Sequence, residues 1–308
     1  MQINSNLGNE NVVVLLLGFN RPELVEKRIN ELAKMRICHL YISIDGGSKS
    51  SLRDIKNIIS NTRKQFLRLE TFEILLHKNN LGITQHITVA MEKTFEKFEY
   101  TIVVEDDIVL SENFYINMLH GFKTQKFHNL KGIVSAFSPL ELSKFNSKKN
   151  KWRTTPYVPI WGWGCSSDIW QQYTPILPKG SLENTLSASN TWQDLNQNQK
   201  KIWLNRFRAI QLNPRITWDI QLQFHSFLND YQNLAPVSRF IDNEGFFDSR
   251  AAHTKGERPR WLGKESFHEA PIISTKILKN SRVFSKIIDS NTYAGDSNLF
   301  KVWQKFRL

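Results

Sequence analysis

Short strand-like runs alternate with amphipathic helical stretches over the first 135 residues, and this alternation limits the possible folds more than any other feature of the chain. The strand-like runs fall at 12–17, 40–44, 72–76, 101–104 and 132–135. Parallel strands need crossover connections, usually helices, so the pattern predicts an α/β fold with a mostly parallel central sheet and flanking helices. Ligands of such sheets bind outside the carboxyl ends of the strands.

Polar residues follow three of these strands at the expected binding edge. They are Asn20 with Arg21, Asp45 with Gly46, and the acidic run Glu105–Asp107. Clustered carboxylates repel one another and resist desolvation, so a fold keeps them on an exposed turn or around a cation. Hard oxygen ligands suit Mg²⁺ or Mn²⁺, which often share their shell with substrate phosphates. The acidic run therefore indicates either a nucleotide-diphosphate site or a solvated turn.

The bulk properties fit a large soluble domain with an anionic partner. The chain has 308 residues, a net charge of +12 and two cysteines, Cys38 and Cys165, without metal-ligand spacing. Its longest early apolar run, Val12–Leu17, is too short for a signal peptide core or a membrane span. We therefore expect a cytoplasmic protein with free thiols. The positive charge alone does not choose among nucleic acid, an acidic membrane face and a nucleotide-diphosphate substrate.

Eight short motifs occur in the order found in one known fold family. They are Asn20-Arg21, Asp45-Gly46, His86, Glu105–Asp107, Val134–Ala136, Gly162-Trp163, Trp218-Asp219 and Pro236–Arg239. This order resembles the GT-A glycosyltransferases, whose Rossmann-like domain binds nucleotide-diphospho-sugars. More narrowly, it is similar to the N-acetylglucosaminyltransferase I family and to bacterial sugar transferases of surface-polysaccharide loci. The resemblance runs from about Val12 to Thr254, and His253-Thr254 matches the bacterial group alone.

The resemblance implies specific roles for the acidic residues. Asp107 would bind the metal, Mn²⁺ or Mg²⁺, that bridges the diphosphate. Asp106 would contact the ribose and Glu105 the donor sugar. Asp219 matches the position of the catalytic base. His253 would be a further metal ligand or would bind phosphate, and its structural alternative is a surface histidine before the basic tail.

The remaining donor-site residues are carried over in the same way. Asp45 would contact the uracil, and Arg21 and His86 would lie near the nucleotide. The donor site would also include Asn20, Gly162 and Trp163.

Each assignment has a structural alternative. Asp219 could cap the helix that it opens, since Asp is a favoured N-cap residue. His86 could be a packed helix histidine, and Asp45 could belong to an ordinary turn. Arg21 could pair with nearby glutamates of its own helix, Glu23 or Glu26. The run 161–164, two tryptophans each followed by glycine, suits either a sugar platform or the core.

The predicted activity is a metal-dependent, inverting glycosyl transfer. A carboxylate-held cation would stabilise the departing nucleoside diphosphate, and Asp219 would take the proton of the acceptor hydroxyl. The donor would be a UDP-sugar, with N-acetylglucosamine or a relative as the sugar. The acceptor would be a glycan or a lipid-linked glycan of surface polysaccharide or lipopolysaccharide synthesis, reached at the inner face of the plasma membrane.

Two other functions stay open. A sugar nucleotidyltransferase would carry a glycine-rich phosphate loop and a lysine after the first strand, whereas this chain has Phe19-Asn20-Arg21-Pro22. A non-catalytic polysaccharide- or nucleic-acid-binding protein would explain the charge, but the basic residues are scattered rather than gathered with aromatics in one motif. We expect no nucleic-acid partner.

The predicted organisation has three parts. Residues 1–137 would form the nucleotide-sugar-binding half of the domain and 138–255 its acceptor-binding, catalytic half, with a polar loop at 138–159. Residues 256–308 would form a basic extension. Its aromatic, cationic end, including Trp303 and Phe306, either touches an anionic membrane surface or packs back on the domain.

Overall fold

A computed structural model describes residues 11–66, 68–138, 151–248, 250, 262 and 271–278. His253 and the end of the predicted extension, with Trp303 and Phe306, lie outside the described residues. Within these ranges none of the helices is both long enough and apolar enough to cross a bilayer.

The amino-terminal half alternates strands and helices as the sequence pattern predicts. Its elements are β1 (Val12–Gly18), α1 (Pro22–Ala33), β2 (His39–Ile44), α2 (Lys49–Ser60), β3 (Thr71–Leu76), α3 (Ile83–Phe95), β4 (Tyr100–Glu105), β5 (Ile108–Leu110), α4 (Phe114–Phe127) and β6 (Val134–Ser135). Helix α2 ends at Ser60, and a 3-10 turn at Arg63–Gln65 follows it. Strand β5 and helix α4 were not predicted.

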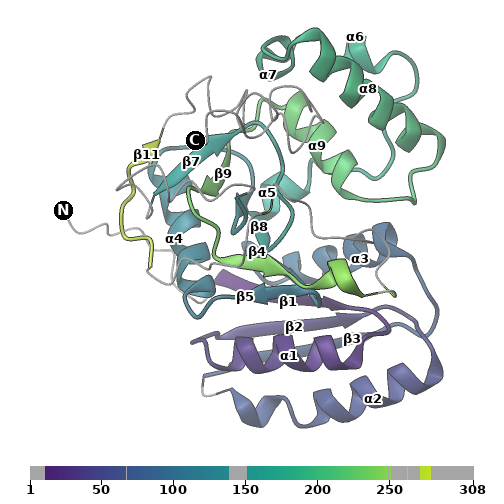
Figure 1. Ribbon diagram of the computed structural model, residues 1–308, viewed down its shortest axis with the longest axis vertical. Helices are drawn as coiled ribbons and strands as arrows, with labels where there is room; N and C mark the ends of the chain where they lie inside the picture. The colour runs from purple at the N-terminus through teal and green to yellow at the C-terminus, as the bar shows by residue number, and fades with distance from the viewer. Residues whose placement is uncertain are drawn as a thin grey trace, which may run out of the picture.

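The second half adds five short strands and a group of helices. They are β7 (Trp152–Thr155), β8 (Trp163–Ser166), α5 (Ser167–Trp170), α6 (Leu182–Leu186), α7 (Asn190–Gln193), α8 (Gln197–Leu212), α9 (Asp219–Leu228), β9 (Asn233–Pro236), β10 (Ile241–Asn243) and β11 (Ile277–Leu278). Strand β7 lies inside the segment 138–159 that was expected to be a loop. Helices α6 to α9 form a lobe at one end of the molecule (Figure 1).

A mixed, mostly parallel sheet joins the two halves, which confirms the predicted fold class. Its nine strands run β11-β7-β9-β6-β8-β4-β1-β2-β3. The strands from β4 to β3 are parallel, whereas β8 runs antiparallel to both of its neighbours, β4 and β6. A separate pair, β5 with β10, is antiparallel.

Strand β1 is buried along its whole length because helices cover both faces of the sheet. Val14 and Leu16 face the cluster that includes Val25 and Ile29 of α1. Leu15 faces the opposite cluster, which includes residues of α3 and of the later tryptophan-rich segment. Continuous apolar runs rather than alternating ones are the sequence signature of such a two-sided position.

Gly164 marks the closest approach between β8 and its surroundings. It pairs with Ile102 of β4, and a Cβ atom built on it would lie 2.6 Å from the Thr101 carbonyl oxygen and 2.8 Å from the Phe122 ring. The carbonyl belongs to a paired strand and cannot easily retreat. The run 161–164 therefore needs this glycine for core packing.

We expect Gly164→Ala to lower the free energy of unfolding by about 2–3 kcal/mol, because overpacking a closed core forces strain on its neighbours. Chemical denaturation measures the change. Gly180→Ala is the matched control: Gly180 has φ of 99° with open space around its Cβ position, so only backbone strain of about 1 kcal/mol is expected. Equal losses for the two variants would contradict the packing role of Gly164.

Candidate functional site: an acidic edge of the sheet

The carboxyl ends of three neighbouring strands bring the predicted polar residues to one edge. Strands β4, β1 and β2 are adjacent and parallel, with Leu17 opposite Glu105 and Gly18 opposite Ile44. The polypeptide leaves these strands as Asn20-Arg21, Asp45-Gly46 and Asp106-Asp107. The expected common edge is therefore present.

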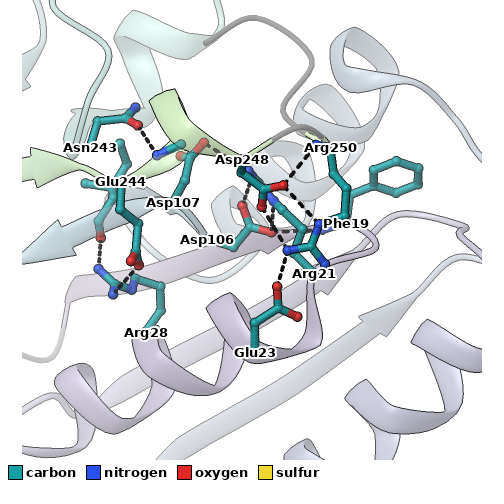
Figure 2. Close-up of polar contacts among 12 residues, drawn as sticks. Phe19, Arg21, Glu23, Arg28, Asp106, Asp107, Asn243, Glu244, Asp248 and Arg250 are labelled. Carbon is teal, nitrogen blue, oxygen red and sulfur yellow. Dashed lines mark hydrogen bonds and ion pairs between the residues drawn. The ribbon is translucent and has the colours of Figure 1, made fainter. Parts of the chain in front are cut away.

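Arg21 bridges the two aspartates of the acidic run. Its Nε donates to Asp106 Oδ2 at 3.1 Å, its Nη2 forms a close ion pair with Asp106 Oδ1, and both Nη atoms reach Asp107 Oδ2 at 3.3 Å. The Phe19 amide also approaches Asp106, at 3.4 Å. Figure 2 shows the guanidinium turned toward Asp106, while the Phe19 ring points away from the cluster. The alternative pairing of Arg21 with Glu23 or Glu26 is not seen among the contacts of the described residues.

Burial makes the acidic run costly to ionise. It raises the pKa of Glu105 to about 8, and the neighbouring carboxylates, including Asp219, add to this rise while Arg21 opposes it. Burial also raises the pKa of Asp106 to about 7 against the influence of Arg21, and it raises the pKa of Asp107. A carboxylate cluster held this way favours any additional cation that reaches it.

A second charged network fixes the backbone of the acidic run, and the sequence reading missed it. The buried Arg28 of α1 donates to the Ile108 carbonyl at 2.5 Å and pairs with Glu244 and Glu31, each at 3.0 Å. The Glu244 amide donates to the Asp107 carbonyl at 2.9 Å. Figure 2 shows Arg28 and Glu244 beside the acidic run. A sequence signal existed: Arg28 falls at the spacing of the apolar stripe of α1.

A third charged group lies at the rim of this edge. Arg250 pairs with Asp248 at 2.9 Å and with Glu23 of α1. Asp248 is close enough to Arg21 for the guanidinium to lower its pKa, although the hydrogen bond from Arg250 lowers it more. Acidic and basic side chains thus alternate outward from Asp106 (Figure 2).

Asp45 holds a neighbouring loop in place. Its carboxylate accepts hydrogen bonds from the amides of Gly46 and Leu81 at 2.8 Å and of Gly82 at 3.1 Å. The Asn79 backbone lies so close to Gly46 that a Cβ atom there would clash at 2.1 Å. In this structure Asp45 therefore makes the contacts of an ordinary turn residue. Its contact with the uracil stays a prediction.

Asn20 connects the loop after β1 to the start of α2. It adopts the left-handed conformation, with φ of 48°, and its Oδ1 accepts the Ser48 amide at 2.8 Å. Ser48 is itself the N-cap of α2. This arrangement orders the loop beside Arg21.

His86 is packed beneath the edge. It is buried on α3, its Nε2 lies 2.8 Å from the Ser43 hydroxyl, and the His77 ring meets it edge-on at 5.3 Å. Burial lowers its pKa to about 4, aided by His77 and opposed by Asp45. The imidazole is neutral at pH 7, and its nucleotide role stays a prediction.

Two tryptophans set the position of Asp219. Trp163 is fully buried opposite Val103 of β4, and its ring stacks on Trp218 at 5.1 Å. Trp218 is the N-cap residue of α9, so Asp219 begins the helix instead of capping it, and its carboxylate accepts a hydrogen bond from Thr217. The stack thereby fixes the start of α9 near the end of β4, where Asp219 acts electrostatically on Glu105.

Gly162 belongs to the same packing. Its φ is 57°, and its carbonyl accepts the Ala136 amide at 2.7 Å. A Cβ atom there would lie 3.0 Å from Phe114. Gly162 and Trp163 are thus core residues in this structure, and their donor-binding role stays a prediction.

The acidic edge fits a metal that arrives together with a diphosphate. In the described part of the chain, no group of three or more His, Cys, Asp or Glu side chains forms a ready metal cage. Mg²⁺ and similar ions are often held by only one or two carboxylates plus substrate phosphates. Asp106 and Asp107 supply such a pair, and they already face a positive group, the Arg21 guanidinium.

Comparison with known proteins gives matches among solved structures only. No protein-family model and no curated protein match the sequence. S. aureus TarS is 10% identical with a TM-score of 0.45, covering 75% of this chain but 36% of TarS. A mannosyltransferase from Pyrobaculum calidifontis, in complex with GDP-Man and Mn²⁺, is 10% identical with a TM-score of 0.42, covering 71% of this chain and 69% of the enzyme. A UDP-glucose pyrophosphorylase complexed with UDP-glucose is 10% identical with a TM-score of 0.38. The match covers 75% of this chain and 91% of the pyrophosphorylase. All three are distant likenesses, with TM-scores below 0.5.

The buried, neutral His86 predicts a loss of stability in acid. Because its folded-state pKa is below that of an unfolded histidine, the unfolded chain binds more protons between about pH 6.5 and 4, and stability falls as pH drops through this window. His86→Gln should remove up to roughly 3 kcal/mol of this acid-induced loss. Urea denaturation of both proteins across this pH range measures it.

Ser43→Ala provides the matched control, because it removes the hydrogen-bond partner but keeps the imidazole. This variant should keep the acid sensitivity of the wild type. An unchanged acid slope in His86→Gln would show that His86 is not held neutral by the fold.

Proposed function

We propose that this protein is a glycosyltransferase that uses a nucleotide-diphospho-sugar. The donor is a UDP-sugar, with N-acetylglucosamine or a related sugar as the transferred group. The acceptor is a glycan or lipid-linked glycan of surface polysaccharide synthesis. The transfer proceeds with inversion at the anomeric carbon.

One observation carries this proposal: buried carboxylates at the carboxyl end of β4 lie within electrostatic reach of a second carboxylate, Asp219, delivered by a different element. The first group, Asp106 and Asp107, sits where α/β sheets bind ligands. The second acts on Glu105 from the start of α9. A transferase needs both groups, one for the leaving diphosphate and one for the incoming hydroxyl.

Asp107, with Asp106 beside it, would hold Mn²⁺ or Mg²⁺ at the donor diphosphate, and His253 would be a further ligand. Bound there, the metal supplies Lewis-acid stabilisation of the negative charge on the leaving group. Arg21 can contribute to the same end, because its guanidinium already lies against both aspartates and suits phosphate oxygens.

Asp219 would act as the general base. The acceptor hydroxyl oxygen attacks the anomeric carbon, the bond from that carbon to the diphosphate oxygen breaks, and the bonding electrons leave with the diphosphate. The hydroxyl proton passes to the Asp219 carboxylate. Attack from the side opposite the leaving group inverts the anomeric configuration.

Two aspartate variants should separate binding from transfer. Asp107→Asn should lose the Mn²⁺-dependent part of UDP-sugar binding, because it removes a charged ligand. Asp219→Asn should retain this binding but slow sugar transfer about 100-fold or more, the usual contribution of a general base. Calorimetric titration with UDP-sugars and Mn²⁺ measures the first effect, and single-turnover transfer to a glycan acceptor measures the second.

Asp168→Asn is a suitable control, since Asp168 also lies in the first turn of a helix but near the opposite end of β4. It should leave binding and transfer unchanged. Full transfer by Asp219→Asn would exclude Asp219 as the base. Formation of UTP and a sugar 1-phosphate from the UDP-sugar and added inorganic pyrophosphate would instead identify a sugar nucleotidyltransferase.

A further inference from the structure

Three exposed aliphatic side chains gather where the helical lobe meets the loop before α9. Leu212, the last residue of α8, is 88% exposed, Ile176 is 66% exposed and Ile216 is 48% exposed. We call these three residues the apolar patch. Single exposed aliphatic residues are common, but several at one place mark an interaction surface.

Hydrogen bonds tie the three segments that carry the apolar patch to one another. Gln211, next to Leu212, donates to the Pro178 carbonyl at 2.5 Å. Gln221 of α9 donates to the Pro214 carbonyl at 2.9 Å and to the Pro175 carbonyl at 3.4 Å. The loops that present Ile176 and Ile216 are therefore held against the end of α8.

The surroundings of the apolar patch are strongly basic. Residues 195–218 contain five Lys or Arg residues and no Asp or Glu. Lys201, Arg208 and Leu212 are all exposed and follow one stripe of α8, because they are spaced by seven and four residues. Arg215, also exposed, precedes Ile216 directly. Three exposed cations, Lys201, Arg208 and Arg215, thus lie on the segments that carry Leu212 and Ile216.

We propose that the apolar patch and these cations dock the protein on an anionic membrane surface. Aliphatic side chains can enter the boundary between headgroups and acyl chains, and each Lys or Arg near an anionic surface strengthens the attraction to it. A single-stranded nucleic acid would call for stacking aromatics, which the apolar patch lacks. A second copy of the chain would bring like charges together in a two-fold contact.

The docking surface is linked to the proposed acceptor side of the site. The Thr84 hydroxyl at the start of α3 donates to the Thr217 carbonyl at 3.0 Å, which holds the loop 213–217 against the sheet domain. That loop leads directly into Asp219. A membrane bound at the apolar patch would therefore lie beside the proposed base; this orientation rests on the proposed function, whereas the docking does not.

Vesicle flotation of the full chain tests the docking. The wild type should float with vesicles of phosphatidylcholine and phosphatidylglycerol but not with phosphatidylcholine alone. Leu212→Glu combined with Ile216→Glu should weaken this binding about tenfold or more, because it removes two apolar contacts and adds two like charges. Ile116→Glu, which changes a 55% exposed isoleucine of α4, should bind as the wild type does.

Donor hydrolysis and thermal unfolding of the same samples separate the possible results. Reduced flotation of the double variant, with unchanged unfolding and hydrolysis, supports the proposal. Undiminished flotation of the double variant, or equal loss in Ile116→Glu, overturns it. A third result would also overturn the proposal: the wild type and Ile116→Glu dimerise with rising concentration, the double variant does not, and none of the three binds vesicles. The apolar patch would then be a contact between two copies of the chain. Active hydrolysis without any vesicle binding would reject the docking while leaving the proposed activity intact.

Discussion

The ion pairs from Arg21 to Asp106 and Asp107 are the interaction on which the candidate site depends. Two adjacent carboxylates at the end of a buried strand lose much of their hydration, and desolvation alone pushes them toward the protonated state. Arg21 follows the neighbouring strand β1 after a short loop and supplies the opposite charge. The parallel pairing of β1 with β4 is what brings this loop and the acidic run together.

The surrounding contacts make this arrangement rigid on one side and open to exchange on the other. Beneath the acidic run, Arg28 and Glu244 hold the Ile108 and Asp107 carbonyls, so the backbone has little freedom. Above it, the guanidinium of Arg21 is the partly exposed member and can pair equally well with phosphate oxygens. In our proposal a diphosphate and its metal enter on this open side, and Arg21 redistributes its hydrogen bonds among carboxylates and phosphates.

The sequence predicts the amino-terminal half of the sheet well because strands buried on both faces read as continuous apolar runs, as in Val12–Gly18. It also predicts the binding edge, since polar residues directly after such runs have few other places to lie. Strands β7 and β8 escape prediction because each has four residues and gains its stability from pairing with distant segments. The support that Trp163 gives to the start of α9, through Trp218, depends on that distant pairing too. Arg28 could have been found, because a charged residue on an apolar helical stripe requires buried partners.

Anomalous diffraction at the manganese edge, from crystals grown with Mn²⁺ and UDP, tests the central claim most directly. Our account predicts one strong peak at coordination distance from an Asp107 carboxylate oxygen, about 2.1 Å, with diphosphate oxygens completing the shell. It also predicts that the Arg21 guanidinium stays within hydrogen-bonding distance of the phosphates or of Asp106. Nucleotide and manganese bound away from this edge of the sheet, with the Arg21 ion pairs unchanged, would contradict it.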